Sequence, residues 1–190
     1  RALIRRELGA CALTLGNSDS AVRVLQRARE EAQDLDDRGA AAFLLARALT
    51  RSGAYQQAVD ACDAVLAQGG RDLALPVRAD LLETSAVALS FVGDSTAARA
   101  RLADAASLLK ELDDPRRLVR SHGSRALVEY RGGNLDAASR GYRAALEAAE
   151  RHGLSDQLAT AALNYGTLCH QRGDWSAAMY PIVATLITEG

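Results

Sequence analysis

Apolar residues recur with the period of an α-helix along the whole chain, and this pattern is broken at five evenly spaced glycines. About four helical turns run into each glycine, and a second helical stretch follows it. The glycines, separated by 37, 40, 40 and 40 residues, are Gly16, Gly53, Gly93, Gly133 and Gly173. Glycine takes the left-handed conformation that ends a helix without steric cost. The pattern therefore predicts five helix–turn–helix units built to one plan.

Small residues occupy matched positions in every unit, where they let two antiparallel helices approach closely. A small residue lies seven positions before each glycine, and an alanine lies five positions after it. A third matched residue lies nine positions after each glycine and is a larger residue in four of the five copies. The three sets are Gly9, Ala46, Ala86, Ala126 and Gly166; Ala21, Ala58, Ala98, Ala138 and Ala178; and Leu25, Cys62, Leu102, Tyr142 and Ile182. Helix pairs repeated at this period predict an all-α solenoid. We expect a single array over 1–190, with repeats of approximately 1–35, 36–70, 72–112, 114–153 and 155–190.

Helix stop and start signals mark the joints between these repeats. Asp36-Asp37 and Asp113-Asp114 are expected to cap helix N-termini, and Pro115 suits the first position of a helix. Gly69-Gly70 and Gly153 are expected to end helices, and Ser155 to cap the next one.

Composition narrows the possible functions. The hydrophobic fraction is 48% and the aromatic fraction only 4%, so Ala, Leu and Val must form the core. Lys110 is the only lysine among 23 basic residues, and the net charge of −1 leaves no basic excess for direct nucleic-acid binding. Without a signal peptide or an 18-residue apolar run, we expect a cytoplasmic protein with no membrane partner. The odd set Cys11, Cys62 and Cys169 is expected to be reduced and buried.

The chain shows no catalytic motif such as a P-loop, HExxH or GxSxG. Cys169 and His170 are neighbours on a predicted helix, so their side chains point about 100° apart and do not form a nucleophile–base pair. The three histidines, His122, His152 and His170, lack the spacing of metal ligands. We therefore expect a protein that is not an enzyme and that uses no cofactor and no metal.

Four matched positions correspond to signature positions of the tetratricopeptide repeat (TPR). They are the small residue, the glycine, a bulky residue two positions after the glycine (Tyr55, Leu135 or Trp175) and the alanine three positions after that. The chain resembles this family over nearly its whole length. Its period of 40 rather than 34, and the missing closing proline, are similar to the longer repeats of bacterial MalT/LuxR-type and other multidomain regulators. The resemblance implies a right-handed α-solenoid of five repeats. It also implies a non-catalytic protein- or peptide-recognition module of a bacterial signalling or transcriptional regulator.

A TPR array binds through the concave groove that its first helices line, and the resemblance carries these positions onto the chain. The groove candidates are Phe43, Arg47, Arg51, Asp80, Glu83, Val87, Phe91, Arg120, Leu127, Tyr130, Arg131, Leu163, His170 and Gln171. Arginine and aromatic residues are common at interface hot spots, and arginine grips carboxylates in bidentate geometry. We expect a peptide with apolar anchors and at least one acidic group. The alternative is a solvated, arginine-rich face.

Two further stretches depart from the repeat. His122, Arg125 and Glu129 share a helical face where other copies are mainly apolar, which indicates either a polar ligand site or an Arg125–Glu129 ion pair at the surface. The C-terminal stretch offers Tyr180, Val183 and Ile187 where the first and fourth copies are charged, and Pro181 lies within its expected helix. This stretch indicates continuation of the solenoid or a self-association segment. Because the chain starts within a helical pattern, we expect a fragment whose partners include other domains of the parent chain. An inducer- or peptide-sensing regulatory domain is the other alternative function.

Overall fold

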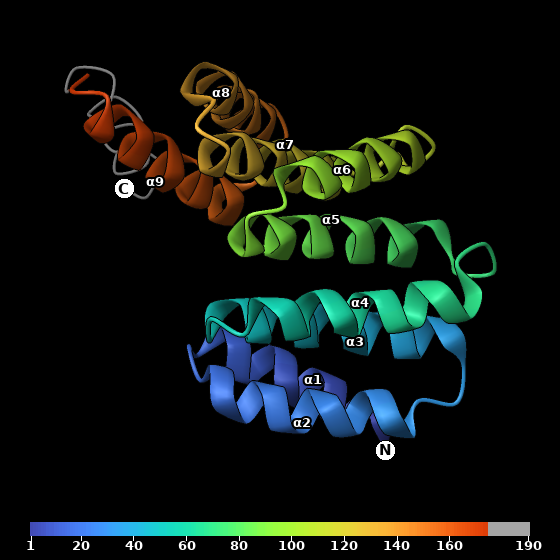
Figure 1. Cartoon of the computed structure of the whole chain (residues 1–190). Helices are drawn as coiled ribbons and strands as arrows, with labels where there is room; N and C mark the ends of the chain where they lie inside the picture. The colour runs from blue at the N-terminus through green and yellow to red at the C-terminus, as the bar shows by residue number, and fades with distance from the viewer. Residues whose placement is uncertain (175–190) are drawn as a thin grey trace. The chain divides into compact units, whose positions relative to one another are not determined.

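A computed structural model of the protein describes residues 1–174. This part of the chain is α-helical and contains no strand (Figure 1). Each repeat glycine is preceded by a first helix and, up to Gly133, followed by a described second helix. The first helices are α1 (Ala2–Thr14), α3 (Leu35–Arg51), α5 (Leu75–Val92), α7 (Pro115–Arg131) and α9 (Ser155–Gln171). The second helices are α2 (Ser18–Glu31), α4 (Tyr55–Gly69), α6 (Ser95–Leu109) and α8 (Leu135–Arg151). The predicted all-α helix–turn–helix plan is confirmed.

The chain divides into two compact units, which we call unit 1 (Arg1–Leu112) and unit 2 (Asp113–Gly190). The division falls between the third and fourth predicted repeats. Unit 1 contains α1 to α6, and the described part of unit 2 contains α7 to α9.

In unit 1 every helix packs against the next one along the chain, and α3 also packs against both α1 and α5. Figure 1 shows α2 and α4 in one layer with α1 and α3 behind them. The second helices lie further apart. Arg101 on α6 reaches Asp63 on α4 through two N–O contacts of 2.5 and 2.8 Å, although the two helix backbones do not pack together. The closer packing of the first helices places them on the inner side of unit 1.

In unit 2 the helices α7, α8 and α9 pack against one another around two apolar clusters. One cluster joins Ala126 of α7 and Leu168 of α9 to Ala138 and Tyr142 of α8. The other surrounds Ala161 of α9 with alanines of α8. Alanine on three helices allows this close packing, and Tyr142 is only 4% exposed within it.

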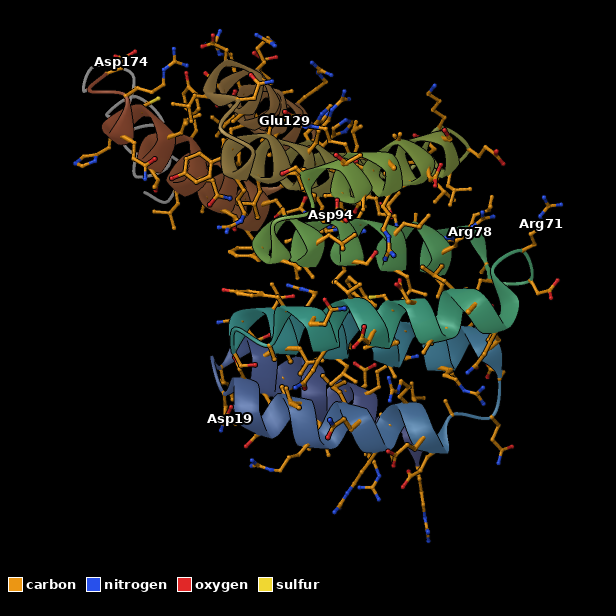
Figure 2. All side chains as sticks on the ribbon, in the orientation of Figure 1. Asp19, Arg71, Arg78, Asp94, Glu129 and Asp174 are labelled. Carbon is orange, nitrogen blue, oxygen red and sulfur yellow. The ribbon has the colours of Figure 1, made fainter. Side chains whose placement is uncertain are left out.

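The turns within the repeats follow the sequence prediction. The five repeat glycines have φ between 74° and 101°, the left-handed region that favours glycine. The residue after the glycine also caps the second helix in three repeats: the side chains of Asn17, Asp94 and Asn134 each accept a hydrogen bond from a backbone N–H three residues on. Figure 2 shows Asp94 at the start of α6. Each of these three turns therefore supplies the N-cap of the helix that follows it.

The matched small residues form the contacts expected of them. The alanines at both matched positions are completely buried in the described repeats: Ala21, Ala46, Ala58, Ala86, Ala98, Ala126 and Ala138. Gly9 packs so tightly on Leu25 that a Cβ on this glycine would lie 2.4 Å from the Leu25 Cγ. Ala178 and Ile182 lie outside the described residues. A small residue on one helix thus admits a large residue from its partner.

Some local predictions were wrong. Asp34, rather than Asp36 or Asp37, caps α3, and Asp36 instead accepts a 2.9 Å hydrogen bond from the backbone N–H of Ala74. Leu154 rather than Ser155 precedes α9, with no side-chain cap. By contrast, Asp114 caps α7 and Pro115 begins it, as predicted.

The cysteine prediction was wrong at one position. Cys62 and Cys169 are buried, but Cys11 is exposed on α1. Burial raises the pKa of the Cys62 thiol to about 12, with the Asp63 carboxylate adding to the effect. Cys62 is therefore an inert core residue.

Candidate recognition surface

The first helices of unit 1 present one shared face, which we call the unit 1 inner face. Its members occupy positions 13, 10, 6 and 2 residues before the repeat glycine, which place them along one side of each helix. On α3 and α5 they are Phe43, Arg47, Arg51, Asp80, Glu83, Val87 and Phe91. These are the unit 1 residues that the sequence predicted for binding.

Arg47 and Phe43 form the central pair of this face. They are one helical turn apart on α3, and the Arg47 guanidinium carbon lies 5.5 Å from the centre of the Phe43 ring. Arg47 is exposed and Phe43 is half-buried. A cation over an aromatic face is stabilised by about 0.5–1 kcal/mol at an exposed site. The contact holds the guanidinium beside an apolar surface while leaving it accessible to solvent.

Arg51 has a structural role at the end of α3. Its Nη1 donates a 2.9 Å hydrogen bond to the backbone carbonyl of Leu13, in the last turn of α1. The last carbonyls of a helix have no partner within the helix, so an arginine from a neighbouring repeat is a suitable donor. Arg51 therefore links two repeats, although it remains exposed on the inner face.

The acidic residues of the same face are buried. Asp80 is 8% exposed and Glu83 only 2% exposed, one turn apart on α5. A carboxylate that is removed from water needs compensating interactions, so these two side chains contribute to the packing of α5 rather than to the accessible surface. The exposed charged side chains at these positions of α3 and α5 are Arg47 and Arg51.

Phe91 also packs between helices. Its ring stacks on that of Tyr55 at a centroid distance of 4.5 Å and an interplanar angle of 11°. Tyr55 begins α4 and Phe91 lies near the end of α5, so the stack joins two successive repeats. Both rings are half-buried, so one side of the Phe91 position borders solvent.

The groove candidates of unit 2 combine apolar, aromatic, basic and amide side chains. Tyr130 of α7 donates a 2.5 Å hydrogen bond to Oε1 of Gln171, which ties α7 to α9. Leu163 of α9 is 67% exposed, whereas Leu127 is half-buried. Arg120 is half-buried, and Arg131 and His170 are exposed. The structure thus places apolar and basic side chains on both first helices of this unit.

The polar trio on α7 does not form a buried cluster. His122 and Glu129 are half-buried, whereas Arg125 is exposed. Burial lowers the pKa of His122, and the positive charge of Arg125 lowers it further. Glu129, labelled in Figure 2, accepts a hydrogen bond of 3.3 Å from Nδ2 of Asn134. Tyr180, Val183 and Ile187, the other candidate interface, lie outside the described residues.

The described residues offer little for metal or nucleophile chemistry. Within 1–174 no group of three or more His, Cys, Asp or Glu side chains is placed to hold a metal ion. Cys169 is buried and His170 exposed, so the adjacent pair points to different environments. No helix in the same part of the chain combines the length and apolar character needed to cross a membrane.

Comparison with solved structures identifies the fold. A Rap protein crystallised with Competence and Sporulation Factor superimposes with a TM-score of 0.86 over 97% of this chain, at 14% sequence identity. The chain has a TPR-type fold. Within that fold it spans 53% of the length of the Rap chain. No protein-family model and no curated protein matches the sequence.

Two other TPR-type structures are similar over the whole chain. PlcR of Bacillus thuringiensis, solved with the peptide PapR7 and DNA, has a TM-score of 0.75 and 10% identity, and the match covers 100% of this chain and 72% of PlcR. TTC0263, a TPR protein of Thermus thermophilus, has a TM-score of 0.67 and 23% identity, with 98% and 90% of the two chains covered. The long-period repeats predicted from the glycines are therefore TPR-like repeats.

Sequence reasoning missed one surface of this TPR-type fold. Ile4 and Leu8 on α1 are 66% and 57% exposed, and Cys11 is exposed beside them. Their positions relative to Gly16 match those of Ala41, Leu45 and Ala48 relative to Gly53, which are at most 1% exposed. Comparing α1 with α3 in this way would have shown that α1 carries apolar side chains at positions that are buried in α3.

Proposed function

We propose that the chain is a non-catalytic recognition module of a bacterial signalling or transcriptional regulator, and that its unit 1 inner face binds a peptide or protein segment with an acidic group. The observation that carries the proposal is the distribution of charge on this face. Arg47 is exposed beside the half-buried Phe43, while Asp80 and Glu83 are buried. An acidic, partly apolar ligand complements such a surface.

The test is selection of peptides from a random display library on the immobilised chain, followed by calorimetric titration of the enriched sequences. We expect the enriched peptides to contain an acidic residue next to an apolar one. Arg47→Glu should weaken their binding by about tenfold or more, because it reverses the charge that meets the ligand.

The matched control is Arg27→Glu, which reverses an exposed arginine on the second helix α2 and should leave the dissociation constant nearly unchanged. Arg51 is unsuitable for this test because its replacement also removes the hydrogen bond to Leu13. Enriched peptides without acidic residues, or equal losses in the two variants, would contradict the proposal.

A sensing role is the second candidate, in which a bound peptide changes the conformation of the regulator. It is supported by the similarity to PlcR, whose structure was solved with the peptide PapR7 and DNA. Small-angle scattering with the selected peptide would distinguish the two roles. A saturable change in the radius of gyration supports sensing, whereas an unchanged scattering curve at full occupancy supports recognition alone.

A further inference from the structure

Helix α3 is enclosed by its neighbours except along one narrow strip, which belongs to the unit 1 inner face. The helices α1, α2, α4 and α5 all pack against it. From Gly39 to the end of the helix, only Arg47 and Arg51 are exposed. One first helix precedes α3 and another follows it, and both pack against it. The strip is therefore not an open end of the array.

The hydrogen bond that fixes Arg51 uses only one end of its guanidinium. Nη1 donates to the backbone carbonyl of Leu13 at 2.9 Å, which holds the planar group in place. Within residues 1–174, Arg51 makes no ion pair, and neither its Nε nor its Nη2 takes part in a hydrogen bond. The N–H groups of Nε and Nη2 lie along one edge of the guanidinium, a geometry that suits both oxygens of a carboxylate. Arg51 is therefore a fixed cation with a carboxylate-binding edge that this part of the chain does not use.

Arg6, the basic residue of the same inner face on α1, shows the contrast. It donates from Nη1 to Oδ1 of Asp37 at 2.7 Å, so its charge is already balanced by a carboxylate of α3. The partner of Arg51 is instead a neutral carbonyl, which leaves the full positive charge of the guanidinium at the surface. Arg6 is accordingly half-buried, whereas Arg51 is exposed.

The spacing along the strip specifies the shape of a matching ligand. Phe43, Arg47 and Arg51 follow one another at intervals of four residues, which is about 6 Å along a helix axis. In an extended peptide every second side chain points to the same side, and such side chains are about 6.7 Å apart. An extended peptide laid along α3 therefore places three alternate side chains over these three residues, and the side chains between them point to solvent.

A helical ligand would need its acidic residues four positions apart to reach the same two arginines. Two like charges at that spacing destabilise a free helix. In an extended chain the acidic residues are only two positions apart and oppose no secondary structure. The strip consequently favours an extended ligand.

We propose that the strip on α3 is a double-carboxylate site. Arg47 and Arg51 each bind one of two acidic side chains that lie two residues apart in an extended peptide, and Phe43 contacts an apolar residue two positions before or after the acidic pair. Arg51 receives its carboxylate on Nε and Nη2, while Nη1 stays on the carbonyl of Leu13. The double-carboxylate site rests on the proposed function, and adds to it the conformation of the ligand and the spacing of its acidic groups.

The probe is a peptide with blocked ends and an uncharged fluorophore, made as Leu-Ser-Glu-Ser-Glu-Ser-Ser and in the reversed order so that both chain directions are tested. Fluorescence anisotropy with the full chain should show saturable binding in one of them. Two peptides of the same composition keep the first glutamate in place and move the second: Leu-Ser-Glu-Glu-Ser-Ser-Ser and Leu-Ser-Glu-Ser-Ser-Ser-Glu, or their reverses. Each should bind about tenfold more weakly, because only one glutamate then reaches an arginine.

A double-mutant cycle assigns each glutamate to its arginine. In the original chain, replacing either glutamate by glutamine should weaken binding about tenfold. Arg51→Gln should remove most of this preference at the glutamate further from the leucine, and Arg47→Gln at the nearer one. Arg51→Gln also removes the hydrogen bond to Leu13, but that loss affects every peptide alike and cancels in the cycle.

Two further variants serve as controls. Arg51→Lys keeps the charge and a donor for the Leu13 carbonyl but lacks the edge of two nitrogens, so it should still lose part of the preference for the further glutamate. Arg27→Gln removes an exposed arginine of α2 and should leave both preferences within about twofold of the original. Thermal unfolding of each variant checks that it is folded.

Four results would overturn the double-carboxylate site and leave the proposed function intact. They are equal affinity for the three spacings, tightest binding of the peptide with glutamates four residues apart, equal coupling of each arginine to both glutamates, and failure of the designed peptides while acidic library peptides bind. Equal affinity would mean that the strip responds to net charge alone. If no acidic peptide binds, whether designed or selected from the library, the proposed function fails together with the site.

Discussion

Gly9 and Leu25 fit together so closely that the missing side chain of the glycine makes room for the leucine: a Cβ on Gly9 would lie 2.4 Å from Cγ and 2.5 Å from Cδ2 of Leu25. Leu25 is completely buried, so its side chain cannot turn into solvent to make room for a methyl group without leaving the core. The first repeat depends on this pair for the approach of α1 to α2.

Gly9→Ala should therefore destabilise the protein. Overpacking a filled core costs about 1–3 kcal/mol, and the better helix propensity of alanine returns about 1 kcal/mol, so we expect a net loss of about 1 kcal/mol. Gly123→Ala on α7 is the control, because no atom lies within 4 Å of the added methyl group. It should stabilise the protein by about 0.5–1 kcal/mol. Urea unfolding of the two variants measures both changes, and equal signs would contradict the packing argument.

The stacked rings of Tyr55 and Phe91 should contribute more together than separately. Offset-stacked aromatic pairs add about 0.5–1.5 kcal/mol beyond the area that they bury. A double-mutant cycle with Tyr55→Leu and Phe91→Leu, followed by urea unfolding, isolates that coupling. Additive losses in the double variant would show that each ring packs independently.

His122 should make stability depend on pH near neutrality. The folded protein lowers the pKa of His122 below its ordinary value of 6.5, so the unfolded chain binds the proton more readily. The stabilising contribution is therefore complete above pH 6.5 and is lost as the pH falls towards the lowered folded pKa. NMR titration measures this pKa directly, with His122→Asn to assign the resonance. Arg125→Ala should raise the pKa of His122, since it removes the nearby positive charge; an unchanged value would contradict this cause.

The three cysteines should differ sharply in reactivity. A maleimide reagent should modify Cys11 rapidly in the native protein, because this thiol is exposed. Cys62 and Cys169 should react only on unfolding, since both are buried and the Cys62 pKa is raised to about 12. Intact-mass spectrometry with and without denaturant counts the modified thiols, and peptide mapping locates them. Rapid native labelling of Cys62 would contradict the burial argument.

The sequence was sufficient to predict the repeat plan because its signals are local. A glycine at φ near 80° and an alanine between two helices depend mainly on their own neighbours, so Gly133 and Ala138 behave as predicted. The cap of α3 was harder to predict, since Asp34, Asp36 and Asp37 are close together and differ only in where the helix begins.

The sequence predicted which helix positions the groove candidates occupy but not how exposed their side chains are. Arg47 and Glu83 both follow from the first-helix positions, yet one is exposed and the other is 2% exposed. Helical periodicity specifies the direction of a side chain, whereas its exposure depends on neighbouring helices that are distant in sequence. Arg125 illustrates the same limit, because it is exposed at a position where α3 and α5 carry the buried Leu45 and Ser85.

The Gly–Asx turns have a consequence for how such a chain can grow. In three repeats the residue after the glycine caps the following helix from within the same turn, as Asn17, Asp94 and Asn134 do. Each of these three turns makes its capping hydrogen bond within its own repeat. Tandem duplication of a 40-residue segment would therefore carry its own turn with it, and selection would then need to adjust only the surfaces where the new copy meets its neighbours.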